Sequence, residues 1–307
     1  SDYLIAEADE SDASFLHLQP LISVITNIDK DHMENHENSF DILKKNFLEF
    51  INNLPFYGLC LLNIDDINTK SIINKISRPI KTFGEDVKAD YQAKSICVEK
   101  IPAKYNYEEN GNLYEIKLNM PGKHNVMNSL AALSVARELN VPIKIIQEAL
   151  ENFPGISRRF EIVGEFKINK NTFTWVDDYG HHPTEMKEVL DTIKNIWVNE
   201  KLVMVFQPHR YSRTAEHFNQ FIDILKNVDQ LVLMDIYAAS EKPLDNINSE
   251  EIVGEIKKYN KNVILINKED ELSEYLDKII ENKNILLTMG AGNISKFVNY
   301  YKKHLIQ

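Results

Sequence analysis

Two hydrophobic patterns alternate along the chain and predict its secondary structure. Short apolar runs rich in β-branched and aromatic residues are typical of buried strands, and stretches with apolar residues three or four positions apart are typical of helices. In the second half, strands are predicted at 202–206, 231–236, 263–266 and 285–288, and helices at 183–197, 212–226, 249–259 and 270–281, with a last helix after Gly292. This regular alternation predicts a doubly wound parallel sheet.

The first half is less regular but also predicts an α/β fold. Its predicted strands are 3–6, 21–28 and 59–64, with a β-rich stretch at 91–118, and its predicted helices are 39–53, 67–76, one that starts near residue 123, and 142–152. Pro154 and Gly155 then stop the last of these helices. The segment 153–160 is therefore a predicted linker between two domains, 1–153 and 154–307.

Composition narrows the class of protein. With 307 residues and 43% apolar content, the chain can bury the cores of two domains. It holds no apolar run of about 20 residues, so no membrane insertion is expected. Two cysteines are too few for a disulfide scaffold, which fits a cytoplasmic protein. The net charge of -11 disfavours nucleic-acid binding.

The densest group of chemically active side chains follows the strand-like run 173–176. Residues 177–182 hold two carboxylates, a phenol and two imidazoles, and Pro183 then opens a helix. In an open α/β sheet, ligands bind at the carboxyl ends of the strands, because backbone groups and helix amino ends converge there. The stretch therefore favours a binding or catalytic site, and an ordinary polar turn is the alternative.

Other predicted strands of the second half end in similar clusters. These are residues 207–213, 235–237 and 290–293. Arg210 and Arg213, three positions apart at the start of a helix, could together hold a carboxylate or a phosphate, and a solvated helix start is the alternative. Gly290 and Gly292 are weak evidence for a dinucleotide site, because the third glycine is absent and they follow the last strand.

The first half carries two further candidate groups. Glu7 and His32 follow predicted strands and could meet one divalent ion or a magnesium nucleotide at a common sheet edge, whereas helix capping and structural hydrogen bonds are the alternatives. His124, Asn125 and Asn128 lie in the first turn of a predicted helix, where donors suit a phosphate or a base edge. An ordinary helix cap is the alternative there.

Eight ordered motifs resemble those of the Mur ligase family. They are Glu7-Ala-Asp-Glu-Ser-Asp12, Thr26-Asn-Ile28 with Asp31-His-Met33, Asn53-Leu-Pro-Phe-Tyr-Gly58, Pro121-Gly-x-His-Asn125 with Asn128, Gly155-Ile-Ser-Arg-Arg-Phe160, Asp177-Asp-Tyr-Gly-His-His-Pro183, Gln207-Pro-His-Arg-Tyr-Ser-Arg-Thr214 and Gly290-Ala-Gly-Asn293. The resemblance extends from Ser1 to about Lys296.

Members of this family have a UDP-sugar domain, a central ATPase domain that begins with a phosphate loop, and a C-terminal domain for the incoming amino acid. This chain contains no G-x-x-G-K-[ST] sequence and starts at Ser1 rather than Met. The resemblance therefore implies an incomplete central ATP- and magnesium-binding domain at 1–153 and a Rossmann-like amino-acid-binding domain at 154–307. We expect the chain to be a fragment of a ligase and to be inactive alone.

The resemblance also implies roles for individual residues. Glu7 and His32 would lie beside magnesium. His124, Asn125 and Asn128 would surround adenine and ribose. Arg159, or else Arg158, would be a hinge arginine that reaches ATP. For the substrates, the implied residues are Asp178, Tyr179, His181 and His182, which face nucleotide and amino acid, and His209, Arg210 and Arg213 near the incoming carboxylate. His32, Arg159, Asp178 and His181 are the expected catalytic residues.

Position 47 bears on the branch of the family. Later ligases of the pathway carry a carbamylated lysine downstream of the metal histidine, where this chain has Phe47. Its absence favours the branch that joins L-alanine to UDP-N-acetylmuramate in peptidoglycan precursor synthesis. The implied reaction uses ATP with Mg²⁺, or Mn²⁺ in its place, and passes through an acyl phosphate. A monomer or a weak homodimer is expected.

Three other interpretations stay open at this point. A muropeptide-recycling ligase of the same family shares nearly every motif but accepts a tripeptide in place of alanine. A metallohydrolase would use Asp178, His181 and His182, although adjacent histidines point apart and rarely bind one ion. The third is a non-catalytic fragment that binds nucleotide or alanine weakly.

Overall fold

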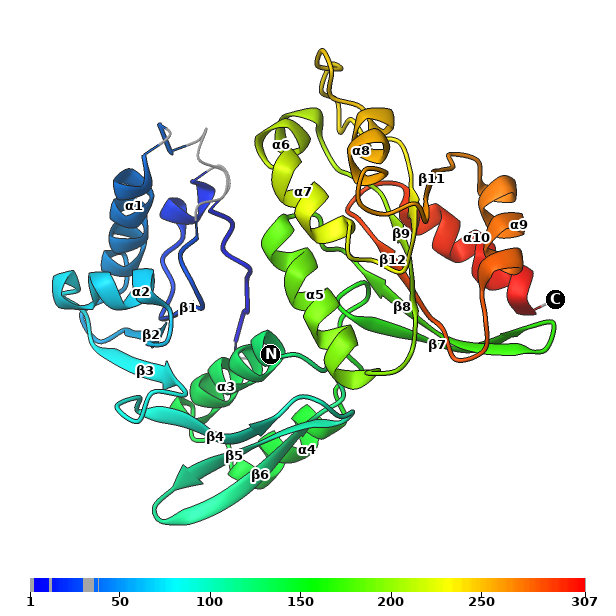
Figure 1. Ribbon diagram of the computed structural model, residues 1–307. Helices are drawn as coiled ribbons and strands as arrows, with labels where there is room; N and C mark the ends of the chain where they lie inside the picture. Colours follow the sequence, from blue (N-terminus) through cyan, green and yellow to red (C-terminus); the bar gives the residue numbers. More distant parts are fainter. Residues whose placement is uncertain (1–2, 11–12, 30–35, 38, 307) are drawn as a thin grey trace. The chain divides into compact units, whose positions relative to one another are not determined.

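The computed structural model describes residues 3–10, 13–29, 36–37 and 39–306 and contains two compact units, Ser1–Phe153 and Pro154–Gln307 (Figure 1). Each unit is an α/β structure built on a six-stranded sheet. The fold class predicted from the sequence is confirmed. In both sheets a block of parallel strands is extended at one edge by antiparallel pairing.

The first sheet has its strands in sequence order. They are β1 (Ile22–Ile25), β2 (Leu59–Asn63), β3 (Ile80–Gly84), β4 (Tyr91–Cys97), β5 (Ala103–Glu109) and β6 (Asn112–Leu118). Strands β1 to β4 are parallel, and β5 and β6 add an antiparallel meander. The β-rich stretch expected at 91–118 is this meander together with β4.

Helices cover both faces of the first sheet. One layer holds α1 (Phe40–Asn52), α2 (Ile67–Ile72) and the short 3-10 turns η1 (Ser14–His17) and η3 (Ile73–Lys75), and the other holds α3 (Lys123–Glu138) and α4 (Ile143–Glu151). Because successive strand residues point to opposite faces, Cys60 and Leu62 of β2 pack in the first layer and Leu61 packs in the second.

Two details of the first unit differ from the sequence-based prediction. The strand expected at 3–6 is not formed, and Leu4 and Ile5 are 93% and 94% exposed. An apolar run becomes a strand only when its backbone groups are paired, and no strand of the described residues pairs with it. Conversely, β3 was not predicted, since Lys81, Thr82 and Gly84 interrupt its apolar character.

The second sheet has the order β11-β10-β9-β12-β8-β7. Its strands are β7 (Glu161–Ile168), β8 (Asn171–Asp178), β9 (Leu202–Phe206), β10 (Gln230–Leu233), β11 (Val263–Leu265) and β12 (Ile285–Met289). Strands β8 to β12 are parallel, as predicted, whereas β7 pairs antiparallel with β8 through a tight hairpin. The last strand in sequence, β12, lies between β8 and β9.

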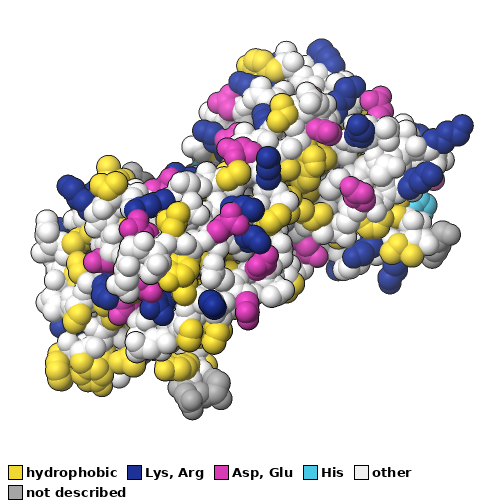
Figure 2. Space-filling view, turned by 90° about the horizontal axis from the view of Figure 1, so that it is seen from below, with side chains coloured by type: hydrophobic (Ala, Val, Ile, Leu, Met, Phe, Trp, Pro, Cys, Tyr) yellow, Lys and Arg dark blue, Asp and Glu magenta, His cyan; other side chains and the backbone are white. Residues whose placement is uncertain are grey.

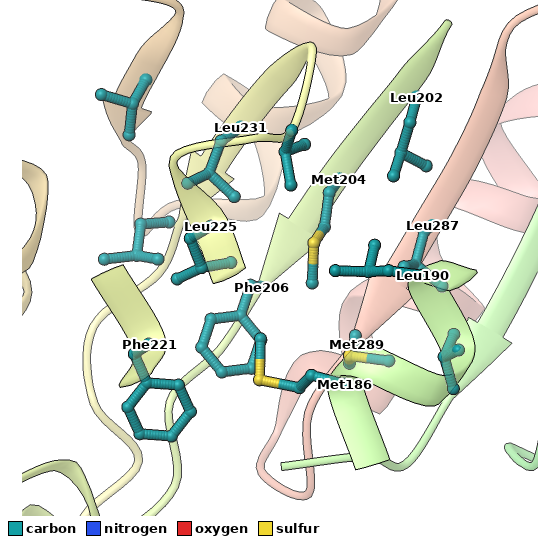
Figure 3. Close-up of a cluster of buried hydrophobic side chains, with 14 of the residues drawn as sticks. Met186, Leu190, Leu202, Met204, Phe206, Phe221, Leu225, Leu231, Leu287 and Met289 are labelled. Carbon is teal, nitrogen blue, oxygen red and sulfur yellow. The ribbon is translucent and has the colours of Figure 1, made fainter. Parts of the chain in front are cut away.

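Helices wind over both faces of this second sheet. They are α5 (Pro183–Ile196), α6 (Tyr211–Glu216), α7 (Phe218–Leu225), α8 (Ser249–Ile256), α9 (Glu269–Ile279) and α10 (Ile294–Ile306). Figure 3 shows the core that α5 and α7 share with β9 and β12, to which Met186, Phe221 and Leu287 all contribute. On the other face α9 and α10 pack against Trp175. The doubly wound arrangement is confirmed, but the helix predicted at 212–226 is divided at His217 into α6 and α7.

Charged side chains of both signs are mixed on one face of the molecule. On the face drawn in Figure 2, basic and acidic side chains alternate and neither gathers into a single large patch. Within the described part of the chain, no helix combines the length and the apolar character needed to cross a membrane.

Leu287 provides a test of the second core, because it lies on β12 and is fully buried. Leu287→Ala should lower the free energy of unfolding of the second unit by about 3 kcal/mol through lost burial and an unfilled cavity. Val198→Ala, at a position that is 76% exposed, should change it by less than about 0.5 kcal/mol. Both tryptophans, Trp175 and Trp197, belong to the second unit, so tryptophan fluorescence during urea unfolding measures this unit selectively. Equal losses in the two variants would contradict the assignment of the core.

Candidate functional site

The polar clusters predicted at four strand ends share one edge of the second sheet. Strand β12 pairs with both β8 and β9, and β9 pairs with β10, all in parallel, so their carboxyl ends lie side by side. A row of rings crosses this edge. The ring centroids of Tyr179 and His181 are 5.4 Å apart, those of His181 and His209 are 5.5 Å apart, and those of His209 and Tyr237 are 5.5 Å apart. The edge thus joins residues that are far apart in sequence.

Asp178 uses both carboxylate oxygens to hold the backbone around it. Oδ2 accepts from the N–H of Phe160 at 2.7 Å, and Oδ1 accepts from the N–H of Gly180 at 2.6 Å. Burial raises the pKa of Asp178, and these two N–H groups oppose the shift. A Cβ at position 180 would lie 2.7 Å from Oδ1, so the turn requires glycine there. In the structure, Asp178 fastens the linker and the turn to the end of β8.

Asp177 joins the linker to the centre of the sheet. Its Oδ1 accepts from the Thr288 hydroxyl at 2.6 Å, and its Oδ2 accepts from Arg158 Nε at 3.1 Å. Arg158 also donates to the carbonyl of Gly290, and its own carbonyl accepts from the N–H of Tyr179 at 2.6 Å. Burial raises the pKa of Asp177 to about 6, and the bonds from Thr288 and Arg158 oppose this rise. Arg158 is therefore an anchor of the linker.

Arg159 and Arg158 both lie over the Tyr179 ring, but Arg159 pairs with a different carboxylate. Its Nη1 lies 3.4 Å from Glu185 Oε1, and its guanidinium carbon lies 5.4 Å from the centre of the Tyr179 ring. The Arg159 side chain is 49% exposed, against 18% for Arg158. Of the two linker arginines, Arg159 is the one whose charge is accessible at the site.

The start of α5 fixes the two adjacent histidines. His182 is the N-cap residue, and its Nδ1 accepts from the N–H of Thr184 at 3.3 Å, while Pro183 occupies the first helical position. Glu185 Oε2 in turn accepts from the N–H groups of His182 at 3.2 Å and His181 at 3.0 Å. Glu185 was not among the predicted site residues, although the spacing of a capping box, with an acid three positions after the cap, is its signal in the sequence.

His209 and the two nearby arginines form the basic part of the edge. Burial, followed by the electrostatic effect of His181, Arg213 and Arg210, lowers the pKa of His209 to about 4, so the ring is neutral at pH 7. His209 Nδ1 and Arg210 Nε are buried and have no hydrogen-bond partner among the described residues. Arg210 has a φ of 70°, which turns the chain between β9 and α6. A buried donor such as Arg210 Nε suits an anionic ligand.

The glycine-containing loop after β12 is packed against Gln207. Gln207 Nε2 donates to Asn293 Oδ1 at 2.7 Å, and its Oε1 accepts from the N–H of Ile294 at 2.9 Å. A Cβ on Gly290 would lie 2.5 Å from the Gln207 carbonyl, and one on Gly292 would lie 2.4 Å from Gln207 Oε1. These glycines are needed for close packing, which explains them without a dinucleotide fingerprint.

The predicted residues of the first unit are less defined. Asn125 is buried and donates from its side-chain amide to the carbonyl of Pro121 at 2.7 Å, which ties the first turn of α3 to the residue before its N-cap, whereas Asn128 is exposed and His124 is half-buried. Glu7 is exposed, and His32 lies outside the described residues. The nucleotide and metal roles of these residues stay predictions.

The metallohydrolase interpretation gains no support from side-chain grouping. Among residues 3–10, 13–29, 36–37 and 39–306, no three His, Cys, Asp or Glu side chains are grouped so that they could hold a metal ion. The carboxylate of Asp178 is engaged by backbone N–H groups, and His182 caps a helix.

Comparison with known protein families shows which family the chain belongs to. The family described as "Mur ligase middle domain" matches residues 1–136, and the family described as "Mur ligase, glutamate ligase domain" matches residues 158–292. The chain belongs to the Mur ligase family. Its second matched region contains all four strand ends that form the candidate edge.

Similar proteins are named as ligases of one kind. A UDP-N-acetylmuramate--L-alanine ligase of Vesicomyosocius okutanii is 46% identical over 297 residues, which are 96% of this chain and 63% of that protein. Ligases of the same name from Ruthia magnifica and Hydrogenovibrio crunogenus are 44% and 42% identical over 100% and 99% of this chain, and each is covered to 66%. The chain therefore spans slightly less than two thirds of the length of these relatives.

Solved structures agree on the fold. The UDP-N-acetylmuramate-alanine ligase MurC of Thermotoga maritima superposes with a TM-score of 0.77 at 29% identity, over 97% of this chain and 62% of that one. MurF of Acinetobacter baumannii superposes with a TM-score of 0.70 at 18% identity, over 95% of this chain and 62% of that one, and at this identity the likeness concerns the fold alone.

Two glycines test the packing of the loop after β12. Gly290→Ala should destabilise the second unit by about 1–3 kcal/mol, because φ is 145° and the new Cβ meets the Gln207 carbonyl. Gly254→Ala, in α8 with open space around it, should instead stabilise by about 0.5–1 kcal/mol. Urea unfolding of both variants measures the difference, and a neutral Gly290→Ala would disprove the close packing.

Asp177 predicts a specific pH dependence. Its pKa in the folded protein, about 6, is above the ordinary value of 3.8, so the fold favours the protonated form. The resulting stability is fully present below about pH 4 and is lost as the pH rises to about 6. Relative to Asp177→Asn, the wild type should lose roughly 2–3 kcal/mol over this interval, since one pKa unit corresponds to about 1.4 kcal/mol.

Unfolding of the wild type and of Asp177→Asn at several pH values measures this change. Carboxyl ¹³C NMR of Asp177 provides a direct reading, with an expected midpoint near pH 6. A midpoint near the ordinary value, or a difference between the two proteins that does not vary with pH, would contradict the predicted shift.

Proposed function

We propose that this chain is the nucleotide- and amino-acid-binding part of an ATP-dependent ligase that joins L-alanine to UDP-N-acetylmuramate. The observation that carries the proposal is its identity of 42% to 46% to three ligases of that name, over 96% to 100% of its length. The geometry of the second unit supports it, since the carboxylate of an amino acid fits the basic edge around Arg210 and Arg213.

The chemistry needs an activated carboxyl group. The muramoyl carboxylate attacks the γ-phosphoryl group of ATP, which gives an acyl phosphate and ADP, and the amine of alanine then displaces phosphate from the acyl carbon to form the amide. Arg159, with its accessible guanidinium, would stabilise charge on the phosphates. MurF of Thermotoga maritima, which shares the fold at 17% identity, has been solved with ADP.

The amine of alanine must be neutral to attack. At pH 7 it carries an extra proton, so a base near the amino-acid loop has to accept that proton. Asp178 is held by two backbone donors, and His182 caps α5. His181, between Tyr179 and His209 in the row of rings, is therefore the favoured base.

Magnesium would supply Lewis-acid charge at the phosphates. Glu7 offers an exposed carboxylate of the oxygen type that Mg²⁺ prefers, and His32 is its proposed companion. His124, Asn125 and Asn128 would contact adenine and ribose at the start of α3.

The setting of the protein follows from the same proposal. We assign it to the cytoplasm, because Cys60 and Cys97 are free thiols and the substrates are cytoplasmic precursors. We further propose a monomer or a weak homodimer with no nucleic-acid partner, in keeping with the net charge of -11.

Phosphate release tests the proposal. With ATP, Mg²⁺, UDP-N-acetylmuramate and L-alanine, the 307-residue chain should release no phosphate, because its sequence holds no phosphate-loop motif. A chimera that adds the part of the Vesicomyosocius okutanii relative outside the region of similarity should release phosphate only when L-alanine is present. Arg213→Ala in the chimera should raise KM for L-alanine at least about tenfold, the loss expected for one charge-assisted contact.

Other outcomes would point elsewhere. Alanine-dependent turnover by the chain alone would refute its predicted inactivity. A chimera that accepts a tripeptide in place of L-alanine would identify a muropeptide-recycling ligase. Hydrolysis without ATP would support the metallohydrolase interpretation instead.

A further inference from the structure

The Glu185 carboxylate lies among more donors than a helix cap requires. Its Oε2 accepts from the N–H of His181 at 3.0 Å and from the N–H of His182 at 3.2 Å, and lies 3.7 Å from His181 Nδ1. Its Oε1 lies 3.4 Å from Arg159 Nη1. A capping box accounts for the bond from the His182 N–H alone. The contacts with His181 and Arg159 need another explanation.

The bond from His181 to the backbone defines the tautomer of its ring. His181 Nδ1 lies 3.0 Å from the carbonyl oxygen of Tyr179. A carbonyl only accepts, so Nδ1 must carry the hydrogen of the neutral imidazole. The nitrogen that can take up a proton is therefore Nε2.

We propose that Glu185 is the positioning residue of the amino-acid loop: by accepting from the backbone N–H groups of His181 and His182 it keeps the His181 ring on the Tyr179 carbonyl, and it ties Arg159 to the same loop. The proposal rests on the function proposed above for the reaction it would serve. The Glu185 carboxylate would thus keep a fixed distance between His181, the base for the amine, and Arg159, the arginine for the phosphates. The group that orients the imidazole by its other nitrogen, a recurrent device for a general base, is here the Tyr179 carbonyl, and Glu185 would act by holding the turn that brings the two together.

Three variants separate geometry from charge. Glu185→Gln keeps an oxygen that accepts from the two N–H groups but loses the charge that attracts Arg159. Glu185→Ala loses both. Asp191→Asn is the matched control, since Asp191 is an exposed acid on the same helix.

Long-range ¹H–¹⁵N spectra of the 307-residue chain give the tautomer directly, with the His181 signals assigned from His181→Gln. The ratio of the Nδ1–H form to the Nε2–H form should be preserved in Glu185→Gln and Asp191→Asn and should fall about tenfold in Glu185→Ala, because the turn that keeps the ring on the Tyr179 carbonyl loses its two N–H bonds to position 185. An unchanged ratio in Glu185→Ala would overturn the proposal. If that variant does not fold, Glu185→Asp, one methylene shorter, replaces it with the same expected loss.

Calorimetric titration with L-alanine provides the functional reading. Affinity should fall about tenfold in Glu185→Ala, by less in Glu185→Gln, and not at all in Asp191→Asn. Equal affinity in wild type and Glu185→Ala would count against a positioning role. A wild type that binds no L-alanine would contradict the proposed function, and the tautomer ratio alone would then decide the role of Glu185.

Discussion

Two buried carboxylates at the end of β8 hold together the part of the second unit on which the candidate site depends. Asp177 joins β8 to β12 through Thr288 and to the linker through Arg158, and Asp178 joins the backbone of Phe160 to the turn at Gly180. Burying charge is costly, and the cost is acceptable only where each oxygen has a donor. Here every carboxylate oxygen has one, so the two acids fix the geometry without leaving a bare charge.

The row of rings rests on this framework. The turn pinned by Asp178 carries Tyr179 and His181, and the loop after β9 brings His209 against Tyr237. Strand β12 lies between β8 and β9, so the loop that follows it passes close to the residues after β9. Gly290 allows this approach, because a side chain there would collide with the Gln207 carbonyl. Polar side chains that follow four separate strands therefore share one edge. Among the described residues, neither a disulfide bond nor a group of metal-binding side chains holds them there.

The sequence predicted this edge well, because strand–helix alternation places the carboxyl ends of parallel strands together. It could not tell Arg158 from Arg159. The two are adjacent, yet Arg158 pairs with a buried carboxylate and Arg159 with a half-buried one. Such choices depend on tertiary neighbours that no local pattern encodes. The same limit explains the strand expected at 3–6, which is apolar but has no pairing partner among the described residues, and the interruption of a helical pattern at His217.

The linker has a practical consequence for dissecting the protein. Judged by secondary structure, the second unit starts at β7, with Glu161. Judged by contacts it starts earlier, since Ser157 donates to Glu161 and residues 158–160 are bonded to β8 and to the loop after β12. A C-terminal piece expressed from Glu161 would expose the two acids of β8 without their partners, whereas one expressed from Pro154 would retain them.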